Sequence, residues 1–140
     1  MKIVNGEVVD EWQSLINPQR HIPSNITRLT GISNNMVVDA PVFAEVADAI
    51  DEFTQDCVFV AHNVNFDYGF IKQEFARLER PFRRPKLCTV RESRKAFPGL
   101  PSYSLANLTK HFEVKMEQHH RALSDARAAA ELLVMSQQVD

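Results

Sequence analysis

The sequence predicts an α/β domain in which a mixed β-sheet is flanked by helices. Three observations lead to this fold class. The pair Asn5-Gly6, between two short apolar segments, is typical of a β-hairpin turn. The apolar run 58–61 precedes a polar turn and a helical pattern, which indicates a strand buried on both faces. Strand and helix patterns then alternate toward the C-terminus, as they do in α/β domains.

Turn and capping residues set the expected boundaries in the first part of the chain. Gly31 suits the left-handed conformation that ends a short helix, and Ser33 offers a new N-cap. Pro41 fits the first position of a longer helix, because the apolar residues after it recur at helical spacing. The elements expected here are strands at 2–4 and 7–16 and helices at 24–29 and 41–53.

The rest of the chain is expected to alternate between strands and helices. Phe66, Phe70, Phe75 and their neighbours form one apolar stripe, and Asn65 is a suitable N-cap for that helix. Ser104 is a suitable N-cap for a later helix. The elements expected are a strand at 58–61, a helix at 66–78, a strand at 86–90, and helices at 91–97, 105–112 and 122–137.

Composition is ordinary for a globular domain. The chain has 140 residues, of which 44% are hydrophobic and 24% charged, enough for one domain with its own core. No apolar run is long enough to span a membrane and the N-terminus does not resemble a signal peptide, so we expect a cytoplasmic protein without membrane contact. Cys57 and Cys88 fall in predicted strands and are expected to be free and buried.

Residues 77–95 form a basic segment in a chain whose net charge is −2. The segment holds eight Lys and Arg residues and two Glu residues. Such a segment could follow the phosphates of a nucleic acid, or it could simply be a solvated surface. Both interpretations stay open at this point.

Two acids and a histidine occur where chemistry could use them. Asp67 follows the predicted buried strand, at the sheet edge where α/β proteins bind ligands, although an acid in a first helical turn also complements the helix dipole. Asp125 shares the apolar face of the last helix, so its charge needs an ion-pair partner or a bound cation. His120 precedes that helix, and its reference pKa of about 6.5 suits proton transfer.

These residues together carry a family resemblance. AHNVNFD at 61–67 and HRALSDA at 120–126 resemble the second and third motifs of DEDD-type 3′–5′ exonucleases of the histidine subclass, the family of the epsilon subunit of bacterial DNA polymerase III. Residues 15–18, 29–32 and 104–108 resemble further segments of that family, in the same order. The resemblance implies a ribonuclease H-like fold and hydrolysis of terminal phosphodiester bonds with two divalent metal ions, Mg²⁺ or Mn²⁺.

The resemblance also implies a role for each matching residue. Asp67 and Asp125 would hold the metal ions, and His120 would be the general base for the attacking water. The expected substrate-binding residues are His62, Asn63 and Phe66, near the terminal nucleotide, and Thr30, Gly31 and Ile32, in a loop against its base or sugar. Each of these six could instead serve packing or turn formation.

One motif of the family has no counterpart in the sequence. The family carries Asp-x-Glu on its central strand, but here Asp10 and Glu11 are adjacent and would point to opposite faces of a strand. We therefore expect residues 1–140 to form an exonuclease domain truncated at its N-terminal end and lacking the central strand. A weakened metal site, an unpaired strand edge and marginal stability would follow.

The expected partner is the 3′ end of single-stranded DNA, in proofreading or repair, with a DNA polymerase subunit as a further candidate. Two alternatives stay open. The first is trimming of RNA 3′ ends, because the sequence shows no feature that reads the 2′-hydroxyl. The second is a catalytically inactive fragment that binds nucleic acid or acts as a scaffold through the basic segment.

Overall fold

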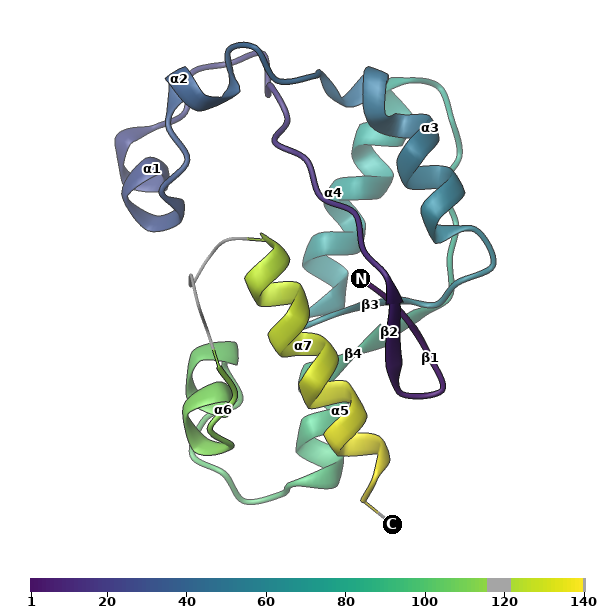
Figure 1. Ribbon diagram of the computed structural model, residues 1–140, viewed down its shortest axis with the longest axis vertical. Coiled ribbons are helices and arrows are strands. Elements are labelled where there is room, and N and C mark those ends of the chain that lie inside the picture. Colours follow the sequence, from purple (N-terminus) through teal and green to yellow (C-terminus); the bar gives the residue numbers. More distant parts are fainter. Residues whose placement is uncertain (116–121, 140) are drawn as a thin grey trace.

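The α/β class is confirmed by the computed structural model, which describes residues 1–115 and 122–139 (Figure 1). Helices surround a small set of short strands near the centre of the molecule. The elements are β1 (Lys2–Val4), β2 (Glu7–Asp10), α1 (Ser24–Thr30), α2 (Asn34–Val37), α3 (Phe43–Thr54), β3 (Phe59–Ala61), α4 (Val64–Arg77), β4 (Lys86–Cys88), α5 (Thr89–Ala96), α6 (Leu105–His111) and α7 (Ala122–Gln137).

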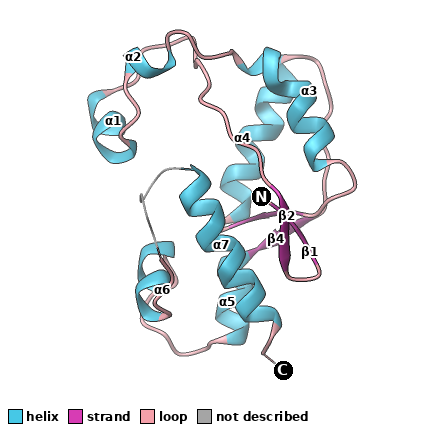
Figure 2. Cartoon of the chain, viewed as in Figure 1, coloured by secondary structure: helices cyan, strands magenta, loops and turns pink. Residues whose placement is uncertain are grey.

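The strands form two separate two-stranded sheets within the described residues (Figure 2). β1 and β2 pair antiparallel around Asn5 and Gly6, whose φ angles of 54° and 82° are those of a tight hairpin turn. β3 and β4 pair in parallel. The prediction that the second hairpin strand runs to residue 16 is wrong, because Asp10 already pairs with Lys2 at the start of β1 and the backbone beyond it meets no further ladder partner.

Several other boundaries differ from the sequence-based expectation. The strand expected at 86–90 ends at Cys88, because Thr89 already begins α5. The longer helix begins at Phe43 instead of Pro41. Cys57 lies before β3 and not in a strand, and both cysteines are free but only half-buried. In contrast, α7 has the predicted bounds, and Ser104 caps α6 by accepting a hydrogen bond from the Asn107 amide at 3.2 Å.

Aromatic side chains form the core between α3, α4 and the loop before β4. Phe75 and Phe82 are each 1% exposed and their rings stack with centroids 4.7 Å apart. Phe43 meets Phe75 edge to face at 5.2 Å, which joins α3 to α4. The buried Tyr68 hydroxyl donates to the Phe82 carbonyl at 3.3 Å, so its one polar atom is satisfied inside the cluster. This core holds the helix that carries Asp67.

Two arginines of the basic segment are neutralised within the fold. Arg84 pairs with Asp51 of α3 at 2.6 Å, and its guanidinium also lies 4.5 Å from the centre of the Phe82 ring. Arg80 pairs with Asp48 at 2.8 Å and with Asp51 at 3.2 Å. These contacts tie the loop before β4 to α3. Part of the basic segment therefore stabilises the fold, and the segment offers less unpaired positive charge than its composition suggests.

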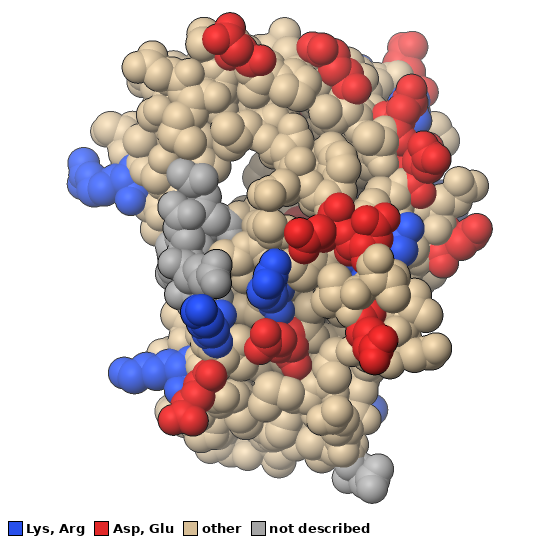
Figure 3. Space-filling view, in the orientation of Figure 1, with Lys and Arg blue, Asp and Glu red and all other residues tan. Residues whose placement is uncertain are grey.

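Charge is unevenly spread over the face shown in Figure 3. Acidic side chains gather over the region of α3 and the hairpin, whereas several basic side chains lie toward α6. None of the helices in the described part of the chain is long and apolar enough to cross a membrane.

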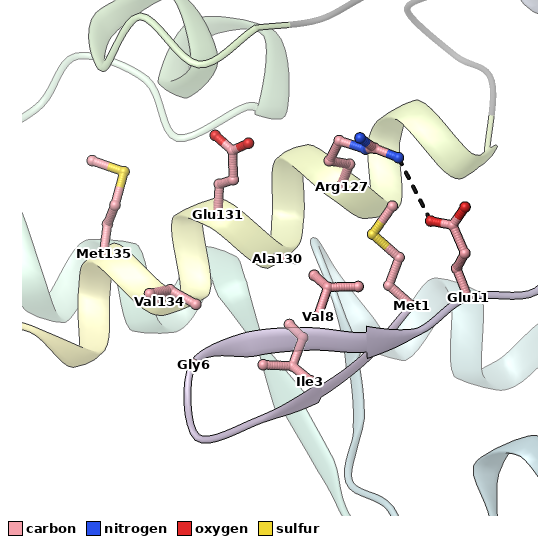
Figure 4. Close-up of a pocket in the computed structure, with 10 residues that line it drawn as sticks. All are labelled: Met1, Ile3, Gly6, Val8, Glu11, Arg127, Ala130, Glu131, Val134 and Met135. Atoms are coloured by element: carbon pink, nitrogen blue, oxygen red, sulfur yellow. Dashed lines mark ion pairs between the residues drawn. The ribbon is translucent and has the colours of Figure 1, made fainter.

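The hairpin lies against α7 across an apolar gap of about 470 Å³ (Figure 4). Ile3 and Val8 project from the hairpin toward Ala130 and Val134 of the helix. At one end of the gap, Arg127 and Glu11 form an ion pair at 3.6 Å. The hairpin is thus held on α7 with unfilled apolar space between them, which loses dispersion contacts that a packed interface would make.

Candidate active site

A cavity of about 1000 Å³ lies where β1, β3, α4, α6 and α7 meet. It brings together residues that are far apart in the sequence, and most of the predicted site residues are among them. Those that line it are Thr30, Ile32, His62, Phe66, Asp67 and Asp125. Two predicted residues, Gly31 and Asn63, do not line this cavity but are adjacent in sequence to residues that do.

Asp67 enters the cavity from the first turn of α4, as predicted. The helix begins two residues earlier than expected, because its N-cap is Asn63 in the left-handed conformation (φ 69°) and not Asn65. Burial of the site raises the pKa of the Asp67 carboxyl above its ordinary value of 3.8; its own backbone amide lowers the pKa, the nearby Asp125 carboxylate raises it further and His62 lowers it. An acid whose pKa is raised by burial and by a second acid is typical of functional sites.

Asp125 reaches the same cavity from the first turn of α7 and is half-buried. The turns that follow it are buried through Ala128, Ala129 and Leu132, so the helix is fixed behind the carboxylate. Ala122, by contrast, is exposed at the start of the helix. Helix packing thus places Asp125 in the lining of the cavity and not inside the core.

The donor chemistry of this pair fits a hard divalent cation. Carboxylate oxygens are the ligands that Mg²⁺ and Mn²⁺ prefer, and two acids that repel each other are relieved by a cation between them. Among residues 1–115 and 122–139, no group of three or more His, Cys, Asp or Glu side chains is gathered closely enough to hold a metal ion. The pair Asp67 and Asp125 is therefore the carboxylate set that this part of the chain supplies. The predicted general base, His120, lies outside the described residues.

The aromatic rings at the start of α4 differ from expectation. Phe66 and Phe70 belong to the predicted apolar stripe with Phe75, but unlike the buried Phe75 they are 63% and 55% exposed. Their rings contact each other with centroids 4.9 Å apart. Phe66 also borders the cavity beside Asp67. An exposed aromatic ring next to paired acids is available to stack on a base, and periodicity alone could not separate this role from core packing.

The segment 30–32 forms a second wall of the cavity. Gly31 ends α1 in the left-handed conformation (φ 75°), as predicted from the sequence. The Thr30 hydroxyl donates to the Ile26 carbonyl at 3.0 Å and accepts from the Ile32 amide at 3.1 Å. These two hydrogen bonds fix the end of α1, where Thr30 and Ile32 line the cavity.

Both ring nitrogens of His62 are engaged by protein atoms. Nε2 lies 2.6 Å from the Tyr103 carbonyl oxygen, and Nδ1 lies 2.7 Å from the Thr89 hydroxyl. Burial lowers the pKa of His62 below 6.5, and this effect exceeds the opposing effects of the Tyr103 carbonyl and of Asp67. Thr89 and Tyr103 were not anticipated from the sequence, because no motif links them to His62.

Comparison with known proteins identifies the family of this chain. A family model described as exonuclease (RNase T) matches residues 1–133. The chain is 43% identical over 134 residues to a PolC-type DNA polymerase III of Caldanaerobacter subterraneus subsp. tengcongensis, covering 96% of this chain and 10% of that protein. It is 40% identical over 130 residues to the 3′-5′ exonuclease DinG of Staphylococcus epidermidis, covering 92% of this chain and 14% of that protein. The chain therefore spans about a tenth of the length of these curated relatives.

A solved structure shares the fold. It is exonuclease X in complex with 5′ overhanging duplex DNA, with a TM-score of 0.67 and 23% identity, covering 98% of this chain and 80% of that chain. This likeness confirms the expected ribonuclease H-like fold. With a family match over nearly all of its length, the chain belongs to the exonuclease family, as its DEDD-type motifs indicated.

Proposed function

We propose that this domain hydrolyses the terminal phosphodiester bond at the 3′ end of single-stranded DNA, using two divalent metal ions. The observation that carries the proposal is that Asp67 and Asp125 face one cavity from two different helices. The two carboxylates are close enough for Asp125 to raise the pKa of Asp67. Family membership supports nuclease chemistry, and the acid pair supports metal ions as the source of it.

Each residue of the candidate site would have its own role in hydrolysis. Asp67 and Asp125 would hold Mg²⁺ or Mn²⁺, which when bound supply activation of a water and charge stabilisation at the leaving oxygen. Phe66 would stack on the terminal base, while Thr30 and Ile32 would bound the opposite side of the nucleotide. His120 would accept the proton of the attacking water, in keeping with its reference pKa.

We also propose that residues 1–140 are part of a domain that a further strand completes. Within the described residues, β3 pairs only with β4, and β3 lines the cavity together with Ile3 of β1. A strand bearing two acids, Asp-x-Glu, would fit beside β3 and extend the acid pair toward a two-metal site. The 140-residue chain by itself would then be impaired in hydrolysis and marginal in stability, because carboxylates that fix the metal ions are lacking.

DNA is the favoured substrate class because of what the relatives are and what one of them binds. The relatives are named as a DNA polymerase and a 3′-5′ exonuclease, and the structural relative is a complex with DNA. We accordingly propose a proofreading or repair role in the cytoplasm, with a polymerase as partner or as the parent chain. The exonuclease X complex shows duplex DNA, so a duplex with a single-stranded end is a suitable second substrate.

The test is metal-dependent release of mononucleotides from a 3′-labelled single-stranded DNA oligomer, with an RNA oligomer of the same sequence in parallel. The chain, its Asp125→Ala variant and a form extended upstream to include any encoded Asp-x-Glu are compared. Glu52→Gln, which removes an exposed acid on α3, is the matched control. We expect activity in the extended form that Asp125→Ala abolishes and Glu52→Gln retains. Faster cleavage of RNA would overturn the substrate assignment, and binding without cleavage in every form would favour a binding module.

A further inference from the structure

We propose that His62 is a positioning residue, a neutral imidazole that fastens the loop before α6 and the start of α5 to the end of β3. This role differs from the contact with the terminal nucleotide that the family resemblance implies for His62. It rests on the proposed function only in its effect on hydrolysis. The two hydrogen bonds of the His62 ring, which we call the clamp, are a property of the fold itself.

The hydrogen bonds define which nitrogen carries the proton. A carbonyl oxygen only accepts, so the 2.6 Å contact with Tyr103 requires a proton on His62 Nε2. In the neutral ring Nδ1 is then an acceptor, and the Thr89 hydroxyl at 2.7 Å is its donor. Thr89 is completely buried, so this hydroxyl is placed by the start of α5. Burial favours the neutral ring, in agreement with the lowered pKa of His62.

One arm of the clamp holds the loop that leads into α6. The Tyr103 hydroxyl donates to the Phe97 carbonyl at 2.6 Å and accepts from the Leu100 amide at 3.2 Å, so residues 97–103 are closed on themselves. The guanidinium of Arg94 lies 5.6 Å from the centre of the Tyr103 ring. The next residues, 104–106, line the cavity. The bond from His62 to Tyr103 therefore sets where this wall stands relative to β3.

The clamp also fixes the short connection between β3 and α4, the helix that carries Asp67. His62 follows the last residue of β3 and precedes Asn63, the left-handed N-cap of α4. Asp67 lies in the first turn of that helix. A side chain fixed at both ring nitrogens prevents rotation of this short connection, which would otherwise change the direction of the Asp67 carboxylate. With both nitrogens engaged, His62 presents only ring carbons to a ligand in the cavity.

Nuclear magnetic resonance of imidazole ¹⁵N tests the clamp without any need for activity. In the 140-residue chain at pH 7 we expect His62 as the neutral tautomer protonated at Nε2. In Thr89→Val the Nδ1 resonance should shift toward that of an imidazole nitrogen without a donor. An Nδ1-protonated tautomer or an imidazolium at pH 7 would overturn the proposal.

Amide hydrogen exchange over residues 103–106 separates the hydrogen bond from packing. Thr89→Val keeps the volume and removes the donor, whereas Thr89→Ser keeps the donor and loses a methyl group. We expect exchange about tenfold faster in Thr89→Val and within about twofold of the parent in Thr89→Ser, as loss of one buried hydrogen bond predicts. The reverse order would assign Thr89 to packing and overturn the clamp. If Thr89→Val does not fold, His62→Phe, which keeps an aromatic ring without nitrogen atoms, is measured in its place with the same expectation.

Kinetics then connect the clamp to hydrolysis. In whichever form of the domain is active, Thr89→Val should lower kcat at least tenfold and leave KM within about twofold, with Thr89→Ser restoring most of kcat. A raised KM with unchanged kcat would show that His62 contacts substrate. If no form is active, the proposed function fails while the resonance and exchange measurements still decide the clamp.

Discussion

Asp67 and Asp125 lie on two helices that begin at the same cavity, and the charge of Asp125 helps to raise the pKa of Asp67. The two helices are held independently, α4 by the aromatic core and α7 by its buried alanine and leucine face. The fold therefore keeps two acids near each other although this opposes their ionisation. Because both helices are held in place, the two carboxylates cannot easily move apart. A cation bound between them would relieve their repulsion.

This relationship predicts that Asp67→Asn stabilises the protein at neutral pH. A raised pKa means that the folded state binds a proton at pH values where the unfolded chain has released it. The stability that protonated Asp67 contributes is fully present below pH 3.8, the ordinary pKa of the carboxyl. It is lost as the pH rises through the raised pKa of the folded state. Thermal unfolding should show a higher Tm for Asp67→Asn at pH 7, with an advantage that shrinks below pH 3.8. The matched control is Glu52→Gln, and an equal gain in that variant would contradict the explanation.

The exposed ring of Phe66 predicts a binding effect without a stability effect. Phe66→Ala should weaken binding of a single-stranded DNA 3′ end by roughly 5- to 150-fold, as loss of one base–aromatic stack of about 1–3 kcal/mol implies. Its Tm should change little, because Phe66 is 63% exposed. Fluorescence anisotropy with a labelled oligomer measures the affinity. Phe70→Ala, which removes the neighbouring exposed ring outside the cavity lining, should bind nearly as well as the parent; equal losses in both variants would argue against a stacking role specific to Phe66.

Arg84 predicts a stability effect within the basic segment. Its side chain is 13% exposed and bonds to Asp51 and to the Thr54 carbonyl, so Arg84→Met should lower the free energy of unfolding by about 2–4 kcal/mol. Arg83→Met, at the exposed neighbouring position, should change it by less than about 0.5 kcal/mol. Urea unfolding measures the free energy of unfolding of both variants and of the parent. Similar values for the two variants would show that the contacts of Arg84 contribute little.

The gap between the hairpin and α7 predicts a stabilising substitution. Ala130 is 8% exposed and borders the gap, so Ala130→Leu should fill part of it and raise the free energy of unfolding by about 1 kcal/mol. Ala76→Leu, at an exposed position of α4, controls for the change in helix propensity. Thermal unfolding compares them. A lower Tm for Ala130→Leu would mean that the hairpin and helix are already too close for a larger side chain.

Local features of the chain were predictable because each rests on neighbouring residues. The Asn5-Gly6 turn, the left-handed Gly31 and the Ser104 cap follow from backbone preferences. The bounds of α7 follow from its apolar periodicity. The resemblance of the two motifs at 61–67 and 120–126 was enough to identify the family, and it implies the metal-binding roles of Asp67 and Asp125.

Contacts between distant segments were decided only by the tertiary structure. The sequence does not show that Arg84 reaches Asp51, that His62 meets Tyr103, or that Phe66 remains exposed, because each depends on which elements pack together. The early end of β2 likewise depends on how many partners β1 offers. The sequence by itself thus determined the identity of the acids and the local turns around them, through short-range backbone and capping energetics. Only the packing of α4 and α7 around β3 decided that the two acids share one cavity, because burial and charge proximity exist only once the chain has folded.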